Sequence, residues 1–462
     1  MNASFLAEVD GLVTFTPRAQ LDKPFAGRQT KPQMGELWQR MTLKDFWKGL
    51  WLTFTSQDPK KVYTEQYPLE RPMVAERYRG APRLNINPET GETLCIACNL
   101  CALACPENLI VVGWHRDDAT RRKVLTHVTE FVAERSAAEL DDSGVEVAGD
   151  ILLNFVTGGK CLRSAFMYLG WLSGAVDSDE ALFAAASLEL LHAFALLQDD
   201  VMDASPSRRG RPAAHVQFGQ WHRKRGLSGS PDRFGESAAI LLGDLCLIWA
   251  EQMLRGSGIE HRRLQQAWPR YDAMRTELAL GQFADLASDV RDLPSMAVVL
   301  EVARRKSGNY TVRRPLEIGA AMSGCSERTL SGLGRYGQAV GEAFQLRDDL
   351  LGVFGAEAVT GKPSGQDLIE RKATSVVIAA HHLADAPTRR QLTDLMNGGN
   401  LDDIAIDRWR TLIVTTGAVQ WIEDTISDRV ASARDELDEL RLDEHVRTAL
   451  ANMAAVCTER AE

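Results

Sequence analysis

The sequence predicts a mainly all-α protein with a small irregular segment on its N-terminal side. From about Arg121 onward, long stretches rich in Ala, Leu, Glu and Arg place apolar residues at helical spacing, as at Leu182, Ala185, Leu188 and Leu191. Nothing in this part alternates apolar and polar residues as a half-buried strand does. The residues before about position 118, by contrast, carry most of the irregular runs of proline, glycine and aromatic residues.

Composition and charge narrow the class of protein. The chain has 462 residues, 45% of them hydrophobic, and a net charge of −10, which suits two or three globular domains. The acidic balance argues against a nucleic-acid partner, because a surface that binds phosphate backbones needs a basic excess. No run reaches the roughly 18 apolar residues that cross a bilayer, and MNASFLAEVDGLVTF lacks the basic lead of a secretory signal. We expect a cytoplasmic protein without a transmembrane segment.

Four cysteines lie within eleven residues near the end of the irregular part. Cys95, Cys98, Cys101 and Cys105, followed by a proline, have the C-x2-C-x2-C-x3-C-P spacing of bacterial ferredoxin clusters. With the preceding TEQYPLERP and YRGAPRLN they resemble the two-cluster iron–sulfur subunit of respiratory complex I over roughly residues 41–125. In that resemblance DFWKGLWLTF is an amphipathic docking helix, and 4Fe-4S is the implied cofactor.

The ligand set for this cofactor is only half present. In such a run the fourth cysteine ligates the other cluster, whose own triplet is missing from the sequence. Two interpretations therefore stay open, an intact 4Fe-4S centre and a truncated remnant, and we favour the remnant. Zinc on the four thiolates is a minor alternative, because the i,i+3 spacing crowds a tetrahedral site.

Glycine and proline divide the helical part into elements. The predicted breaks are at Gly158-Gly159, at Pro206, in the loop from Gly226, at Pro294 and in the loop from Val359.

The element that ends at the second break carries two acids on one face. Asp199 and Asp203 are spaced i,i+4, and the preceding segment is nearly all small or apolar, which predicts burial. Buried carboxylates are costly unless a cation or hydrogen bonds compensate them. Magnesium prefers carboxylate oxygens and commonly bridges to substrate phosphate, and the pair Arg208-Arg209 supplies forked donors for a diphosphate. An exposed helix end that serves solubility is the alternative.

A second acidic helix is predicted around FQLRDDLLG, residues 344–352. Gln345 and Asp349 share one of its faces, and the basic residues Lys362 and Lys372 follow it. Two acidic helices in one helical domain, each followed by basic residues, can hold a metal–diphosphate cluster between them.

Taken in order, the motifs of the helical part resemble those of trans-prenyltransferases, the farnesyl and geranylgeranyl diphosphate synthases. They are GGKCLR, ELLH, DDVMD, RRG, GQFAD, KSGNY, FQLRDD and GKPSGQDL. The resemblance covers about 340 residues, from roughly 122 to the end of the chain. It implies an isoprenoid-synthase helical bundle, a homodimer, and a Mg2+-dependent condensation of isopentenyl diphosphate with an allylic diphosphate.

The same resemblance assigns roles to individual residues. The magnesium ligands would be Asp199, Asp203, Asp348 and Asp349, with Asp200, Gln282, Asp285 and Asp367 in support. The allylic diphosphate would contact Arg208, Lys306 and Lys362. The diphosphate of isopentenyl diphosphate would be held by Lys160, Arg163, His192 and Arg209. The reacting carbons would be bordered by Ser307, Tyr310 and Gln345. The catalytic set would comprise Asp199, Asp200, Asp203, Arg208, Lys306, Gln345 and Lys362.

Two positions depart from the family pattern. Gly352 stands where the second aspartate motif has a third acid, and Cys161 stands where many bacterial relatives have arginine. We expect the metal site to survive, because in this family the first acid of that motif, here Asp348, does most of the coordination. We expect little effect from Cys161, because Lys160 and Arg163 keep the diphosphate contacts.

Product length is predicted from Phe194, five residues before Asp199 and about 7.5 Å along a helix axis. A single aromatic beside the small Ala195 resembles the archaeal-type geranylgeranyl diphosphate synthases. We therefore expect a twenty-carbon product, with farnesyl diphosphate as the alternative. The competing interpretation is that Phe194 belongs only to the core.

The sequence thus predicts residues 1–40 as an unassigned segment, 41–120 as a partial ferredoxin-like fragment and 121–462 as a polyprenyl synthetase domain. An iron–sulfur electron-transfer subunit of a quinone oxidoreductase with a fused helical domain is the alternative of another class. It is disfavoured because the prenyltransferase motifs are nearly complete. A terpene cyclase is disfavoured because it does not need the group that holds isopentenyl diphosphate.

Overall fold

The computed structural model describes residues 117–140, 144–287, 293–355, 365–398 and 401–458. The chain divides into two units, Met1–Arg116 and Asp117–Glu462, and the described residues all belong to the second. The predictions for residues 1–40 and 41–120, including those for Cys95, Cys98, Cys101 and Cys105, lie outside the described residues. The division of the chain into three ranges stays a prediction.

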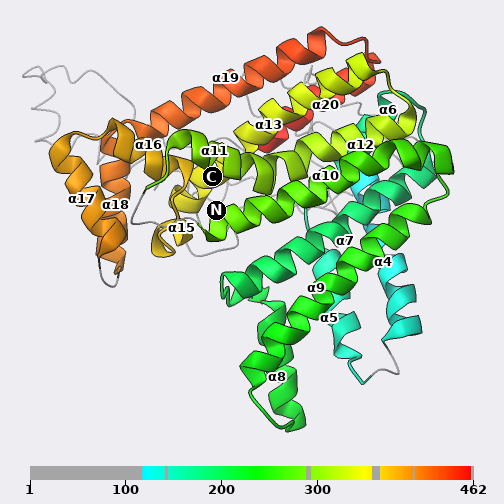
Figure 1. The fold of residues 1–462 in the computed structure, drawn as a ribbon, viewed down its shortest axis with the longest axis horizontal. Helices are drawn as coiled ribbons and strands as arrows, with labels where there is room; N and C mark the ends of the chain where they lie inside the picture. Colours follow the sequence, from blue (N-terminus) through cyan, green and yellow to red (C-terminus); the bar gives the residue numbers. More distant parts are fainter. Residues whose placement is uncertain (1–116, 141–143, 288–292, 356–364, 399–400, 459–462) are drawn as a thin grey trace, which may run out of the picture. The chain divides into compact units, whose positions relative to one another are not determined.

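The described part is almost entirely helical (Figure 1). Its helices are α4 (Asp117–Glu139), α5 (Val147–Val156), α6 (Leu162–Leu172), α7 (Asp179–Met202), α8 (Ala214–Arg225), α9 (Pro231–Arg255), α10 (His261–Leu286), α11 (Met296–Ala303), the π-helix η2 (Arg304–Arg313), α12 (Arg314–Ser323), α13 (Glu327–Phe354), α15 (Gln366–Ile369), α16 (Ser375–Leu383), α17 (Ala386–Asn397), α18 (Asp403–Thr415), α19 (Ala418–Asp438) and α20 (Glu444–Thr458). The all-α prediction is confirmed for these residues.

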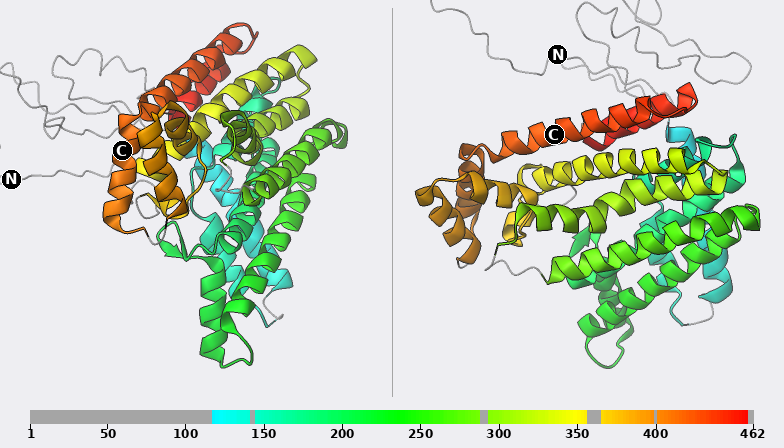
Figure 2. Two further views of the ribbon diagram at one scale, coloured as in Figure 1. Left: turned by 60° about the vertical axis from the view of Figure 1, so that its left-hand side comes forward. Right: turned by 45° about the horizontal axis from the view of Figure 1, so that its top comes forward.

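The long helices pack side by side as a bundle. Helix α7 packs against α9, α6 and α4, and α13 packs against η2 and α19. Figure 2 shows α19 lying along α13, while α16, α17 and α18 gather at one end of the bundle. The apolar series predicted for α7 is buried, with Leu182, Leu188 and Leu191 no more than 2% exposed. Helix α7 is therefore a core helix, and its C-terminal end carries the first aspartate motif.

Local sequence explains where the helices that carry the site begin. Ser178 caps α7 by accepting a hydrogen bond from the backbone N–H of Ala181, and acidic residues fill the first turn. Ser230 caps α9 in the same way, directly before a proline at the first helical position. Ser326 caps α13. These caps fix where α7 and α13 begin, and so the position along each helix of its aspartate motif.

A two-residue hairpin follows α7 and was not predicted from the sequence. Strands β1 (Ser207–Arg208) and β2 (Arg211–Pro212) pair antiparallel. The two residues between them, Arg209 and Gly210, both have positive φ, at 52° and 71°, which matches the tight turn that favours glycine at its second position. The hairpin fixes the directions of Arg208 and Arg209.

Three helices approach one another closely through glycine. A Cβ added at Gly341 of α13 would lie 2.6 Å from the carbonyl oxygen of Gly308 in η2, and one added at Gly281 of α10 would lie 2.6 Å from the backbone nitrogen of Lys306. Helices α10, η2 and α13 are thus held at backbone contact. Because π-helical turns are rare and concentrate at functional sites, η2 marks a region of interest.

Two described helices, α7 and α9, are long and apolar enough to cross a membrane by length and composition. Within the most apolar window of each, 67% of α7 and 44% of α9 is buried inside the protein. For α7, burial against its neighbours accounts for the hydropathy, as in any helix that is apolar all round and lies in a core.

Candidate active site

A cavity of about 980 Å³ opens among α6, α7, α10, η2 and α13. Its walls carry most of the residues that the sequence singled out, namely Lys160, Arg163, His192, Phe194, Asp199, Arg208, Arg209, Gln282, Lys306, Ser307, Tyr310, Gln345, Asp348, Asp349 and Asp367. Asp200, Asp203 and Asp285 lie next to this set without lining the cavity. Lys362 lies outside the described residues.

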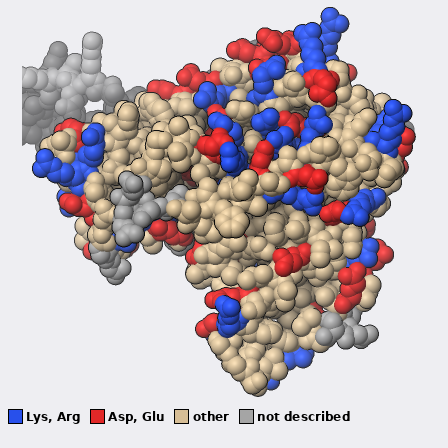
Figure 3. Space-filling view, in the orientation of Figure 1, with Lys and Arg blue, Asp and Glu red and all other residues tan. Residues whose placement is uncertain are grey.

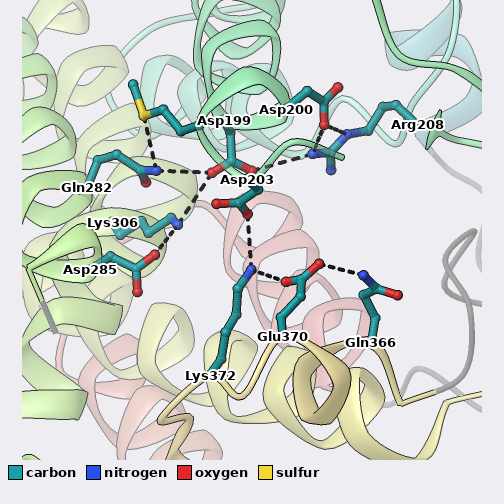
Figure 4. A network of polar contacts seen from close by, with 11 residues as sticks. Asp199, Asp200, Asp203, Arg208, Gln282, Asp285, Lys306, Gln366, Glu370 and Lys372 are labelled. Carbon is teal, nitrogen blue, oxygen red and sulfur yellow. Dashed lines mark hydrogen bonds and ion pairs between the residues drawn. The ribbon is translucent and has the colours of Figure 1, made fainter. Parts of the chain in front are cut away.

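Asp199 lies at the centre of a polar network at the C-terminal end of α7 (Figure 4). Its Oδ1 accepts a hydrogen bond from Gln282 Nε2 at 3.2 Å and lies 3.5 Å from Lys306 Nζ. Its Oδ2 lies 3.4 Å from Arg208 Nη2. Lys306 also donates to Asp285 Oδ2 at 2.6 Å. Burial lowers the pKa of Lys306, but the carboxylates of Asp199 and Asp285 raise it above its ordinary value overall.

Asp203 contacts Lys372, a basic residue to which the sequence assigned no individual role. Lys372 Nζ donates to Asp203 Oδ2 at 3.1 Å and forms an ion pair with Glu370 Oε2 at 2.7 Å. Burial lowers the pKa of Lys372, but Glu370 and Asp203 raise it above its ordinary value overall. Lys372 follows Asp367 by five residues, so a search for basic residues after the second aspartate motif points to it.

Asp200 is turned away from the cavity and holds Arg208. Its side chain is 1% exposed, and its Oδ1 accepts from Arg208 Nε at 2.8 Å and also from Nη2. Burial lowers the pKa of Arg208, while Asp200 and Asp199 raise it above the ordinary value overall. Within the predicted catalytic set, Asp200 therefore acts on the position of Arg208 rather than on a ligand in the cavity.

On the second acidic helix, Asp348 and Asp349 both line the cavity, and Asp349 is also buried within the bundle. Asp349 Oδ2 accepts from the Ser375 backbone nitrogen at 3.0 Å and from Ser375 Oγ at 2.6 Å, and its Oδ1 accepts from Gln345 Nε2 at 2.7 Å. Burial raises the pKa of Asp349. Both oxygens of Asp349 already accept hydrogen bonds, which disfavours Asp349 as a metal ligand.

The missing third acid at Gly352 has a structural explanation. A Cβ added at Gly352 would lie 1.8 Å from Oδ2 of Asp367. Asp367, from the short helix α15, therefore fills the place that a side chain at 352 would occupy. Since position 352 lies one turn after Asp348, the carboxylate of Asp367 stands beside Asp348.

The residues that the resemblance assigns to the diphosphate of isopentenyl diphosphate lie near the start of α6. Arg163 Nη2 donates to Thr311 Oγ1 at 3.0 Å, and its guanidinium lies 4.3 Å from the centre of the Tyr310 ring. The Tyr310 hydroxyl lies 3.3 Å from His192 Nδ1. Burial and the cations Arg163, Arg209 and Arg208 lower the pKa of His192 well below its ordinary value of 6.5. His192 is therefore neutral at neutral pH.

Two further residues of this corner were missed by sequence reasoning. Arg121 Nε donates to the carbonyl of Gly159 at 2.9 Å and so holds the glycine turn from α4. Glu189 is 7% exposed, lines the cavity and accepts from Ser164 Oγ at 2.7 Å. Glu189 lies one turn before His192, which is the signal that could have identified it. Cys161 is buried here, and burial raises the pKa of its thiol, as expected of a small structural residue.

The cavity continues from these polar groups into an apolar part. That part is lined by Phe194, Ala195, Leu247, Leu278 and Phe344. The predicted floor residue Phe194 thus faces the cavity, as Ala195 does.

Among the described residues, no three carboxylate, imidazole or thiol groups come close enough together to hold a metal ion alone. Mg2+ commonly binds through one or two carboxylates and completes its shell with water and substrate phosphate. Asp199, Asp203 and Asp348 are the oxygen donors that could take part. The cations beside them supply a diphosphate with charge-assisted donors.

The helical part of the chain is similar to several known proteins. A family model described as polyprenyl synthetase matches residues 146–409. Geranylfarnesyl diphosphate synthase of Aeropyrum pernix is 32% identical over 285 residues, which are 61% of this chain and 83% of that protein. The solved structure of geranylgeranyl pyrophosphate synthase from Corynebacterium glutamicum, complexed with isoprenyl diphosphate and magnesium, has a TM-score of 0.71 and 34% identity. The match covers 74% of this chain and 99% of the chain in that structure.

The N-terminal part is similar to a different protein. NADH-quinone oxidoreductase subunit I 2 of Solibacter usitatus is 66% identical over 96 residues, which are 21% of this chain. The chain spans 64% of that relative's length, so more than a third of the relative lies outside the match.

Proposed function

This chain belongs to the polyprenyl synthetase family, and from that premise we propose that it condenses isopentenyl diphosphate with an allylic diphosphate to yield geranylgeranyl diphosphate. Short-chain prenyl diphosphate synthesis is the activity of the group of relatives to which it is similar, and Mg2+ is the ion typical of the family. The proposal specifies the substrates and the product length for this chain.

The observation that carries the proposal is the convergence of acids and cations at one end of an apolar cavity. Asp199 from α7 and Asp348 from α13 line the same cavity, with Lys306 and Arg208 beside Asp199. A second cationic group, around Arg163 and Arg209, lines the cavity near its other polar corner. Two cationic groups and one apolar pocket match a reaction between two diphosphates whose hydrocarbon chains join.

Each group has a definite task in that reaction. Arg208 and Lys306 would bind oxygens of the departing diphosphate, and Asp200 and Asp285 hold them in place. When bound beside Asp199, Asp203 and Asp348, Mg2+ adds positive charge that stabilises the leaving group. Lys160, Arg163 and Arg209 would hold isopentenyl diphosphate. The apolar walls exclude water from the cationic carbon that forms when the allylic C–O bond breaks.

His192 contributes without a charge. Burial and the neighbouring cations lower the pKa of the ring, so it would act as a hydrogen-bond donor to a diphosphate oxygen rather than as a proton carrier. As the proton acceptor we propose the leaving diphosphate itself.

The twenty-carbon product rests on Phe194. This side chain lines the cavity about 7.5 Å along α7 from Asp199, and its small neighbour Ala195 leaves room beside it. Replacing Phe194 by Ala should lengthen the product, and an unchanged product length would remove Phe194 from the account. Farnesyl diphosphate is the alternative product.

We also propose a homodimer through α9 and α10. Leu241 and Ile248 of α9, and Phe283 of α10, are 67%, 53% and 73% exposed. In the orientation of Figure 3 much of the surface over α9 is uncharged. Large apolar side chains gathered on neighbouring helices are typical of an interface. Sedimentation of the full chain, compared with Leu241→Lys, tests this. We further propose a cytoplasmic location. The burial of α7 among its neighbours accounts for its hydropathy without a membrane.

For the N-terminal part we propose a truncated ferredoxin-like fragment. The match to the quinone oxidoreductase subunit favours an iron–sulfur origin, with 4Fe-4S as the cofactor that the four cysteines would hold. An electron-transfer role for the whole chain is the alternative function, favoured by the 66% identity of that match.

One incubation tests the proposed activity. Labelled isopentenyl diphosphate is mixed with full-length protein, Mg2+ and allylic diphosphates of increasing length, and the products are separated by chain length. We expect label in geranylgeranyl diphosphate, and no label when a chelator replaces Mg2+. Absence of incorporation with every allylic partner would overturn the proposal.

A further inference from the structure

The apolar part of the cavity has a charged side chain at its far end. One face of α10 lines the cavity through Gln282, Ala279, Leu278 and Arg275, at the three- and four-residue spacing of a helix. The series begins beside Asp199 and ends at Arg275. A guanidinium is an unusual group for a wall that faces hydrocarbon.

Arg275 is held in place on three sides. Its Nη1 donates to Glu251 Oε2 of α9 at 3.0 Å, and its Nη2 forms an ion pair with Asp272. Its guanidinium lies 4.4 Å from the centre of the Tyr271 ring, close enough for a cation–π contact. The ion pair with Glu251 therefore joins α9 to α10 across this end of the cavity.

The packed core follows directly behind this ion pair. Tyr271 is fully buried. Leu247 lies one turn before Glu251 on α9, and Leu278 lies one turn after Arg275 on α10. The pair thus lies one helical turn beyond the apolar wall residues Leu247 and Leu278 and beside the buried Tyr271.

Arg275 lies deeper in the cavity than Phe194. Helices α7 and α10 run in the same direction toward the polar end (Figure 1), where Gln282 contacts Asp199. Arg275 precedes Gln282 by seven residues, about 10 Å of helix, whereas Phe194 precedes Asp199 by about 7.5 Å. A growing hydrocarbon chain would meet Phe194 first and Arg275 next.

The two side chains stop a hydrocarbon chain for different reasons. Phe194 blocks by volume and can rotate about its side-chain bonds. Arg275 and Glu251 are 27% and 26% exposed, and a hydrocarbon chain that displaced this ion pair would have to press an unpaired guanidinium against its apolar end, which is costly. From this arrangement, and resting on the proposed function, we infer that Arg275, positioned by Glu251, is a specificity-determining residue that sets the upper limit of product length.

The test compares products in a background where the first stop is removed. Phe194→Ala is combined with Arg275→Met, which keeps length and loses charge, or with Arg275→Lys, which keeps the charge. We expect the Met combination to make products at least one isoprene unit longer than the Lys combination. Phe194→Ala with Glu251→Gln, which removes the ion pair to α9 without altering the guanidinium, should also extend the products. The matched control is Arg270→Met in the same background, because Arg270 lies on α10, is 25% exposed and pairs with Glu327 at 3.9 Å outside the cavity wall.

Each outcome bears on one claim. The inference would be overturned if the longest products of the Met and Lys combinations had the same length. It would also be overturned if Arg270→Met lengthened the products as much as Arg275→Met does. No product from the unaltered protein would overturn the proposed function instead. The inference is then judged by binding of alkyl diphosphates of increasing length. Affinity should fall at a shorter chain length in the Lys combination than in the Met combination, and an identical fall in both would overturn it.

Discussion

Asp199, Asp200 and Asp203 lie within one turn and a half of helix, yet their surroundings differ, and we expect them to respond differently to substitution. Asp199 lies between Lys306 and Arg208 on the cavity wall, and Asp203 contacts Lys372. Asp200 is the buried partner of Arg208. The motif DDVMD therefore combines two carboxylates that could face a ligand, Asp199 and Asp203, with one carboxylate, Asp200, that only positions Arg208.

This difference gives a prediction for two neighbouring asparagine variants. Asp199→Asn should lower turnover by about a hundredfold or more, as loss of a group that stabilises transition-state charge does, with little change in stability. Asp200→Asn should cost about 3 kcal/mol of stability, because it leaves a buried guanidinium without its counter-charge. Chemical unfolding and steady-state kinetics on both variants check this. Equal losses of stability would contradict the assignment.

His192 gives a prediction about pH. Its pKa in the folded protein lies below its ordinary value of 6.5, so the unfolded chain binds a proton first as pH falls. The stability contributed by the neutral ring is present above pH 6.5 and is lost as pH falls below it, by at most about 1.4 kcal/mol per pH unit. Urea unfolding at several pH values should show a smaller acid loss for His192→Gln than for the unaltered protein. Parallel losses in the two proteins would refute the neutral assignment.

Some of the site was predictable because its spacing is local, and the rest depends on contacts between distant residues. The i,i+4 rule places Asp199 and Asp203 on one face, whatever surrounds them. The partner of Asp203 is Lys372, 169 residues away. The inward turn of Asp349 depends on Ser375, 26 residues away, and the Gly352–Asp367 contact joins two elements. No spacing rule reports such contacts.

At the scale of elements, the site depends on how closely α10, η2 and α13 approach. The all-helical character follows from the helical spacing of apolar residues, and the break at Pro206 follows from the proline itself. The π-helix and the β1–β2 hairpin do not, because each extends over only a few residues and is set by packing. The need for glycine at positions 281, 308 and 341 becomes clear only when the position of the neighbouring backbone is known.

The contact between α13 and η2 can be tested with one methyl group. Gly341→Ala places a Cβ 2.6 Å from the carbonyl oxygen of Gly308, so the two helices must separate. We expect a loss of about 1–3 kcal/mol in stability and a raised KM, because Lys306 moves with η2. Gly332→Ala, on the same helix, meets only the side chain of Leu440 and should cost less. The reverse order would contradict the account.

At the scale of the whole molecule, the chain joins a prenyltransferase to a part that is similar to NADH-quinone oxidoreductase subunit I. The family match lies within residues 146–409, and the site described above draws its residues from the described helical unit. We therefore expect synthase turnover to be independent of the cysteine cluster.

The cluster itself gives a spectroscopic prediction. Full-length protein purified without oxygen should contain less than one 4Fe-4S cluster per chain, because half of the ligand set of the two-cluster arrangement is missing. Iron analysis and visible absorption, with Cys98→Ser as the comparison, provide the measurement. A stoichiometric brown chromophore that Cys98→Ser abolishes would show that the fragment is not a remnant.

The central claim is that α7 and α13 present acids to one metal–diphosphate site. Its most direct test is the binding of Mn2+, as a paramagnetic substitute for Mg2+, to the full chain with and without inorganic diphosphate. We expect tight binding that requires diphosphate and weakens at least tenfold in both Asp199→Asn and Asp348→Asn. Binding that is independent of diphosphate, or unchanged in Asp348→Asn, would contradict it.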